Sequence, residues 1–168
     1  MVGVQNIQKK HDASRLLFFV ALSIIALDQL TKYLIKVNLA FNETIDIIQG
    51  IFSVTYRTNT GIGFGLLQGL NIPLMVVSSI IILLMGYFYY KLDKKETLMR
   101  FPLGLIISGA LSNLVDRIIQ GSVTDFIYVH GWPAFNVADS AISIGAVMLI
   151  IMHIRKTEGK AKNKSEPH

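Results

Sequence analysis

Four apolar stretches, each part of a segment long enough to cross a lipid bilayer, constrain this chain more than any other feature. They are Leu16–Ile35, Ile72–Tyr90, Phe101–Val115 (continued by two charged residues) and a segment from about Phe135 to Ile154. A helix of about 20 residues spans the hydrocarbon core of a bilayer. The 168-residue chain is 52% hydrophobic and only 16% charged, which is too apolar for a water-soluble domain. The sequence therefore predicts an all-α membrane protein, a bundle of four transmembrane helices.

The basic residues predict the orientation of these helices. Twelve of the sixteen Lys and Arg residues precede the first stretch, separate the second from the third, or follow the fourth. Such residues are enriched in cytoplasmic loops, so both termini are expected in the cytoplasm and the other two connections outside. We expect residues 1–156 to form one membrane domain and residues 157–168 a basic, disordered cytoplasmic tail. This placement accounts for the net charge of +5, and no nucleic-acid partner is expected.

The connection between the first two helices contains a pattern typical of β-structure. Thr44–Thr55 alternates β-branched and polar residues around a turn at Gln49-Gly50. A small extracytoplasmic β-element is therefore predicted between helices 1 and 2.

Carboxylates from different segments are predicted to meet near the outer end of the bundle. With a rise of about 1.5 Å per residue, Asp28, Asp116 and Asp139 fall at similar depths of three helices. Asp125 lies in or just before the second outer connection. Ionisable side chains at membrane depth are costly, and they are normally paired or functional. This convergence is the main functional signal in the sequence.

Two of these acids have local partners that favour a supporting role. Asp28 and Lys32 are spaced i,i+4 with the acid first, the favourable order for an ion pair on one helical face. Asn113, Asp116 and Arg117 likewise share one face of the third helix, where Arg117 is available to a carboxylate of a neighbouring helix. The alternative to a catalytic role for these residues is a polar network that only holds the helices together.

Asp125 and Asp139 have no obvious local cation, and together they suggest hydrolysis. When two carboxylates share a site, repulsion and desolvation keep one of them protonated while the other accepts a proton from water. Such a pair hydrolyses amides, and neither a metal nor a cofactor is expected. Asn136 precedes Asp139 by three residues, and it is placed to bond a member of the pair or the substrate backbone.

Other hydrolytic machinery is missing from the sequence. It contains no cysteine, no HExxH zinc pattern and no GxSxG serine element. Serines on the membrane helices are expected to serve close packing: Ser108, Ser112, Ser140 and Ser143. Three alternatives stay open, namely a small proton-coupled transporter, a non-catalytic scaffold, and an aspartyl protease of the presenilin kind, whose YD and GxGD motifs are absent.

Five blocks of residues resemble, in order, the lipoprotein signal peptidases, which are type II signal peptidases and aspartic proteases of bacterial membranes. The blocks are Asp28–Lys32, Asn59–Gly65, Gly109–Arg117, Val123–Ile127 and Phe135–Ser140. The chain departs from the usual family pattern at Ser112, where Gly is common, and at Ile62-Gly63, where Ala-Ala is common.

The resemblance implies that Asp125 and Asp139 form the catalytic dyad of an aspartic endopeptidase. It also implies residues that line or support the site: Asp28, Lys32, Asn59, Asn113, Arg117 and Asn136. The implied substrate is a prolipoprotein with a diacylglyceryl cysteine, cleaved before that cysteine to release the signal peptide. Membrane lipids are the other implied partners, and the enzyme is expected to be a monomer in the bacterial cytoplasmic membrane. By the same resemblance, the cyclic peptide globomycin would occupy the cleft.

Overall fold

The computed structural model describes residues 2–61, 69–92 and 97–165, and it contains the four predicted helices. They are α1 (Val2–Asn38), α2 (Asn71–Lys91), α3 (Thr97–Gln120) and α4 (Val137–Ser165). Within them, the segments long and apolar enough to cross a membrane are Phe18–Asn38, Asn71–Lys91, Leu98–Gln120 and Val137–Arg155. The prediction of a four-helix membrane protein is confirmed. The α4 helix continues through part of the basic segment that begins at residue 157, and the domain boundary there stays a prediction.

The distribution of polar side chains is the reverse of that in a water-soluble protein. Large apolar residues such as Leu83 and Ile119 are 72% and 78% exposed, whereas Asp28 and Lys32 are almost completely buried. Lipid solvates the apolar surface, and the polar side chains are satisfied by one another inside the bundle.

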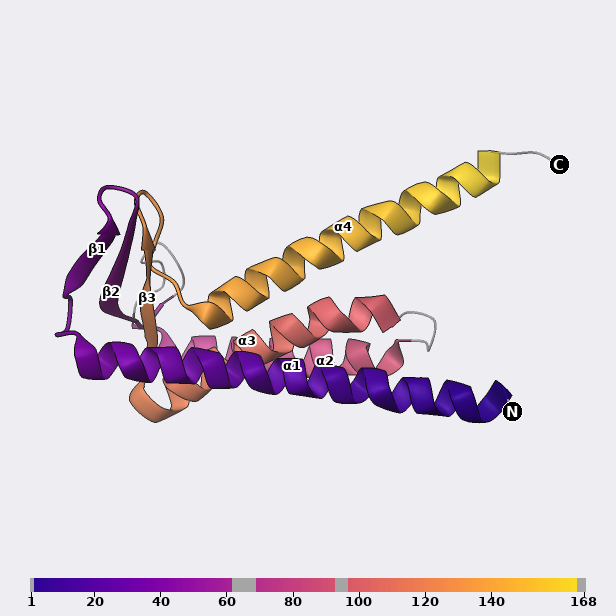
Figure 1. Cartoon of the computed structure of the whole chain (residues 1–168), viewed down its shortest axis with the longest axis horizontal. Coiled ribbons are helices and arrows are strands. Elements are labelled where there is room, and N and C mark those ends of the chain that lie inside the picture. The colour runs from indigo at the N-terminus through magenta and orange to yellow at the C-terminus, as the bar shows by residue number, and fades with distance from the viewer. Residues whose placement is uncertain (1, 62–68, 93–96, 166–168) are drawn as a thin grey trace.

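A three-stranded antiparallel sheet caps one end of the helices. It consists of β1 (Thr44–Ile48), β2 (Phe52–Asn59) and β3 (Val123–Val129), in the order β1-β2-β3. The predicted hairpin is present, and Gly50 in its turn has φ 71°, a left-handed conformation that favours glycine. Figure 1 shows both chain termini at the opposite end of the helices from the sheet.

The third strand lies in the connection after α3, where no β-structure was predicted. The sequence Val-Thr-Asp-Phe-Ile-Tyr-Val has the β-branched and aromatic residues of a strand, but its partner β2 is more than sixty residues earlier in the chain. The register pairs Arg57 with Asp125 and Asn59 with Val123. This pairing brings Asp125 to the end of the helices, next to the start of α4.

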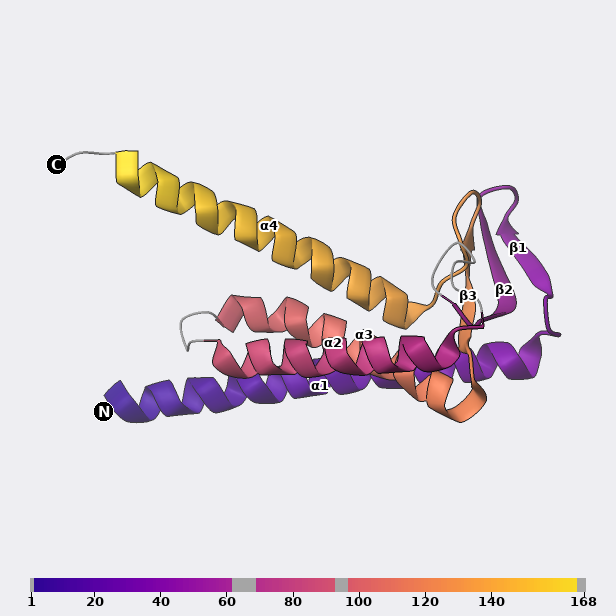
Figure 2. The ribbon, with the colours of Figure 1, turned by 180° about the vertical axis from the view of Figure 1, so that it is seen from behind.

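Helix α3 is the centre of the bundle, because it packs against each of the other three helices. Two glycines, Gly109 on α3 and Gly145 on α4, lie in its contact with α4. A Cβ atom at Gly109 would collide with the carbonyl oxygen of Ala138, and one at Gly145 would lie 2.7 Å from the carbonyl oxygen of Pro102. Towards its C-terminus, α4 diverges from the other helices (Figures 1 and 2). The contact with α3 therefore fixes the first part of α4.

We expect Gly109→Ala to lower the free energy of unfolding by about 1–3 kcal/mol, the usual cost of overpacking. The added methyl group meets the backbone of α4, which cannot move aside as a flexible side chain can. Gly86→Ala on α2 is the matched control, because a Cβ there meets no atom within 4 Å. That substitution should be neutral or stabilising, since alanine is the better helix former. Thermal unfolding in detergent measures both, and equal effects would contradict the role of the Gly109 contact.

Candidate active site

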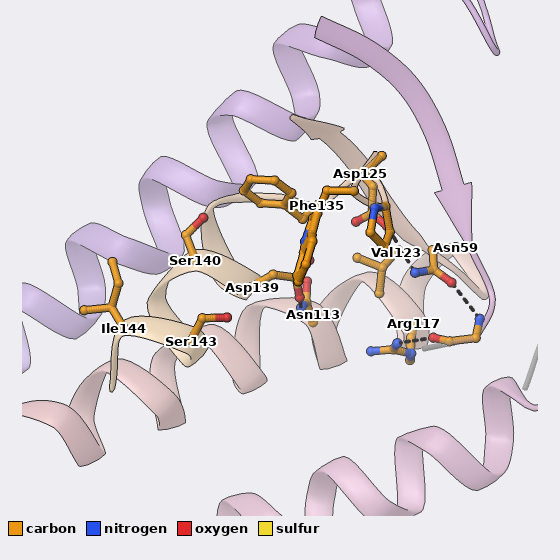
Figure 3. A pocket seen from close by; sticks show the side chains of 14 residues that line it. Asn59, Asn113, Arg117, Val123, Asp125, Phe135, Asp139, Ser140, Ser143 and Ile144 are labelled. Carbon is orange, nitrogen blue, oxygen red and sulfur yellow. Dashed lines mark hydrogen bonds between the residues drawn. The ribbon is translucent and has the colours of Figure 1, made fainter. Parts of the chain in front are cut away.

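A pocket of about 540 Å³ lies at the sheet end of the bundle, and both candidate catalytic carboxylates line it. Asp125 comes from β3 and Asp139 from the first turn of α4. The other lining residues are Asn59, Gly61, Asn113, Arg117, Val123, Trp132, Pro133, Ala134, Phe135, Ser140, Ser143 and Ile144. Figure 3 shows Asp125 beside Asn59, and Asp139 beside Asn113. The pocket thus joins two strands, β2 and β3, two helices and the loop before α4.

Asn136 connects the two carboxylates. Its side-chain oxygen accepts the backbone N–H of Asp139 (2.9 Å), and its own backbone N–H donates to Asp139 Oδ2 (3.3 Å). This reciprocal arrangement is a capping box at the start of α4. The amide nitrogen Nδ2 of Asn136 then donates to Asp125 Oδ1 (2.8 Å). One side chain therefore orients both acids. Its oxygen faces an N–H donor and its nitrogen faces a carboxylate acceptor, so the orientation of the amide is unambiguous.

Asp125 is buried, and within the described residues each of its carboxylate oxygens accepts a hydrogen bond from a neutral side-chain amide. Besides Asn136, Asn59 donates to its Oδ2 (3.1 Å). Asn59 is itself held by the backbone N–H of Gly61, which donates to its Oδ1 (2.9 Å). Burial, followed by the charge of Asp139, raises the pKa of Asp125 to about 7, against the lowering effect of the two amides and of Lys32.

Asn113 links the pocket to the buried charges behind it. Its Nδ2 donates to Asp139 Oδ1 (2.8 Å). Its Oδ1 accepts hydrogen bonds from Lys32 Nζ (2.9 Å) and from Asn136 Nδ2 (3.2 Å). Two donors on the oxygen fix the amide so that its nitrogen faces Asp139.

Lys32 is the centre of that buried group. Its ammonium lies 2.6 Å from Asp28 Oδ2 and 2.9 Å from Asp116 Oδ2, and it also donates to Asn113. An ammonium group has three N–H donors, and here there is an acceptor for each. The predicted pair of Asp28 and Lys32 therefore forms, and Asp116 from α3 joins it.

Arg117 also lines the pocket, but it donates to a backbone carbonyl: its Nη2 lies 3.1 Å from the oxygen of Gly61. Its Nε is buried and has no hydrogen-bond partner within the described part of the chain. The arginine thus holds the segment that follows β2 against α3. The rest of the predicted motif, Ile62 to Gly65, lies outside the described residues.

The structure also brings in residues that the sequence did not indicate. Gln29 donates to Asp116 Oδ1 (2.9 Å), and Ser112 donates to Asp28 Oδ2 (2.7 Å), so Ser112 does more than allow close packing. The carbonyl oxygen of Thr124 accepts from Asn136 Nδ2 (3.3 Å). The sequence contains two weaker signals: all three residues fall within the blocks that resemble the family, and Ser112 precedes Asp116 by four residues and so shares its helical face.

Comparison with known proteins decides the family. The sequence pattern of the family described as Signal peptidase (SPase) II matches residues 20–155, which include every site residue above. The chain belongs to the signal peptidase II family. A lipoprotein signal peptidase of Halothermothrix orenii is 39% identical over 81% of this chain and 93% of its own length. One of Bacillus subtilis is 35% identical over 89% of this chain and 99% of its own length.

The fold of this signal peptidase II family member agrees with its sequence relationship. A solved structure described as a bacterial membrane enzyme matches with a TM-score of 0.82 and 29% identity, covering 90% of this chain and 93% of that one. A second one matches with a TM-score of 0.74 and 30% identity, over 81% and 90% of the two chains. The chain is therefore a multi-pass bacterial membrane protein with the fold of a membrane enzyme.

Proposed function

We propose that this signal peptidase II family member is an aspartic endopeptidase in which Asp125 and Asp139 activate a water molecule. The observation that carries the proposal is the pair of carboxylates held by one amide, Asn136, in the wall of the same pocket. Two carboxyl groups in different protonation states provide both the acid and the base that amide hydrolysis needs.

In the proposed mechanism, Asp125 is the protonated member and Asp139 the ionised one. A pKa of about 7 favours a proton on Asp125. The charge of Asp139 is stabilised at the N-terminus of α4, where it accepts N–H donors from Asn136 and Asn113. Asp139 removes a proton from water as the water oxygen attacks the scissile carbonyl carbon, and Asp125 donates its proton to the carbonyl oxygen. The resulting diol collapses when Asp125 takes a hydroxyl proton back and Asp139 passes its proton to the leaving nitrogen.

The proposed substrate is a prolipoprotein with a diacylglyceryl cysteine, cut on the N-terminal side of that cysteine. The relatives are named lipoprotein signal peptidases, which supports this class of substrate. The pocket lies at the end of two membrane-crossing segments, and apolar side chains of Trp132, Phe135 and Ile144 line it together with the acids. A substrate anchored in the bilayer by both a signal helix and acyl chains would reach such a pocket without leaving the membrane.

We also propose that both termini face the cytoplasm and that the sheet and pocket lie at the extracytoplasmic side. Lys91, Arg100 and Arg155 lie at or near the ends of the membrane-crossing segments that are remote from the sheet (Figure 1), and cytoplasmic ends carry the excess of basic residues. We further propose that the protein is a monomer in contact with membrane lipids. Residues 157–168 would form a separate basic tail in the cytoplasm.

The test is cleavage by the purified full-length protein in proteoliposomes. A diacylated prolipoprotein is added, and the two products are identified by mass spectrometry. We expect a signal peptide with a free carboxylate and a lipoprotein that begins with the lipidated cysteine. The matched control is the same prolipoprotein without the diacylglyceryl group, which should be cleaved much more slowly. Release of no signal peptide, or cleavage at another bond, would refute the proposed function.

The pH dependence of cleavage follows from the role of Asp125. An acid with a pKa of about 7 is protonated and competent below that pH, and it loses its proton above it. The value of kcat/KM should therefore decline above about pH 7, by close to tenfold per pH unit. The measurement is kcat/KM between pH 5.5 and 8.5. The pH at the midpoint of the decline belongs to the coupled pair of carboxylates and not to Asp125 alone. A profile that rises through pH 7 would instead make Asp125 the base.

A further inference from the structure

A second polar cluster lies behind the pocket, between α1, α3 and the first turn of α4. We call it the inner cluster, and it consists of Asp28, Gln29, Lys32, Ser112 and Asp116. None of these residues is among those that line the pocket within the described chain. Their influence on a substrate must therefore pass through residues that do line it.

Ser112 has a hydroxyl group with a defined direction. Gln29 Nε2 donates to Ser112 Oγ (3.0 Å), so Oγ is an acceptor in that bond. Its own hydrogen is then available to Asp28 Oδ2, which lies 2.7 Å away. Ser112 is completely buried, so water does not compete for this bond.

Asp28 transmits this contact to α4. Its Oδ1 accepts the backbone N–H of Ala138 (2.8 Å), and Ala138 is the residue before Asp139. Lys32 and Ser112 together hold Oδ2, so the carboxylate plane of Asp28 is fixed by α1 and α3. The Asp28 carboxylate thereby ties three helices at the turn that carries Asp139.

We propose that Ser112 is a positioning residue for Asp139, which it places through Asp28 and the first turn of α4. This inference rests on the proposed function in one respect, namely that Asp139 takes part in the reaction. A reacting carboxylate displaced by a fraction of an ångström from a water or carbonyl loses rate without losing its charge.

Three substitutions separate positioning from packing. Ser112→Ala keeps the Cβ atom but removes the donor to Asp28. Ser112→Gly removes the whole CH₂OH group and leaves space of about 30 Å³, enough for one water that Asp28 and Gln29 can bind. Ser108→Ala is the matched control, because Ser108 is equally buried on the same helix, and its partners in the described structure are the carbonyl oxygens of Gly104 and Leu105 of that helix.

Positioning predicts one order of the rates and helix packing predicts the opposite order. We expect Ser112→Ala to lower kcat on the order of tenfold with KM changed less than about twofold, and Ser112→Gly to retain more of the rate. We expect Ser108→Ala to leave kcat unchanged. Thermal unfolding should rank Ser112→Ala above Ser112→Gly, because alanine is the better helix former. A kcat order that follows the stability order, or a Ser112→Ala rate equal to that of Ser108→Ala, would overturn the proposal.

Hydrogen exchange provides a readout that does not depend on cleavage. The peptide that contains the Ala138 amide should exchange faster in Ser112→Ala than in wild type or Ser108→Ala, because Asp28 no longer holds that amide as firmly. Unchanged exchange at Ala138 would refute the positioning role even if the rate falls. If Ser112→Ala does not fold, kcat and Ala138 exchange are compared between Ser112→Gly and Ser108→Ala. We expect Ser112→Gly to show the lower kcat and the faster exchange, and equal values would overturn the proposal. Failure of the proposed function is distinct, since it would leave the wild-type protein without peptidase activity.

Discussion

Replacing Asp125 or Asp139 with asparagine is expected to reduce kcat for prolipoprotein cleavage by about 10²–10⁴-fold in each case. Asparagine has nearly the shape of aspartate, so the pocket should be preserved while the acid or the base is lost. Each variant retains an acceptor for only one of the two donors, because asparagine has a single amide oxygen. That oxygen can accept from Asn59 at position 125 or from the Asn136 N–H at position 139, whereas the second donor, Asn136 Nδ2 or Asn113 Nδ2, loses its acceptor. The measurement is single-turnover release of the signal peptide in proteoliposomes.

Asp46→Asn is the control for the loss of a carboxylate from the same sheet. Asp46 lies on β1, accepts a hydrogen bond from Ser53 Oγ (2.6 Å) and is not among the residues that line the pocket. Its variant should cleave at the wild-type rate. If either Asp125→Asn or Asp139→Asn retains substantial cleavage with a normal melting temperature, that residue is not part of the dyad.

Lys32→Met is expected to have the largest effect on stability, lowering the free energy of unfolding by about 3–5 kcal/mol. The substitution keeps the apolar stem but leaves Asp28 and Asp116 buried without their common cation. It also removes a donor from Asn113, whose amide bonds Asp139, so the rate should fall as well. The cleaved bond should stay the same, because Lys32 does not line the pocket.

Lys36→Met provides the comparison on the same helix. Lys36 is one turn further along α1 and half-buried, and it makes a solvent-exposed hydrogen bond to Gln120 Oε1 (2.6 Å). Exposed interactions of this kind contribute little to stability, so this variant should unfold and cleave nearly as wild type does. Equal stability of the two variants in detergent would show that the buried charges do not depend on Lys32, and a shifted cleavage site would contradict its supporting role.

The sequence predicted what depends on local pattern. Apolar length determined the four helices, and the i,i+4 spacing predicted the pair of Asp28 and Lys32. The three-residue spacing of Asn136 and Asp139 placed them on one face, which is the spacing of a capping box.

Long-range pairing was beyond the reach of local pattern. The strand that carries Asp125 pairs with β2, and that register is set by tertiary contacts between segments far apart in the chain. The contact of Lys32 with Asp116 depends on how α1 and α3 are rotated against each other, which the hydrophobic pattern of a lipid-exposed helix does not specify. The hydrogen bond from Asn136 to Asp125 depends both on this strand register and on the packing of the helices.

The hydrogen bond from Ala138 to Asp28 joins residues 110 positions apart, the start of the last helix and the middle of the first membrane-crossing segment. The helices α1, α2 and α3 are therefore synthesised before the Ala138 amide, the donor to Asp28 Oδ1, exists. Asp139 arrives with that same turn of chain. A chain that stops before α4 has neither Asp139, the base of the proposed mechanism, nor the support of that residue, so under this proposal peptidase activity requires all four helices.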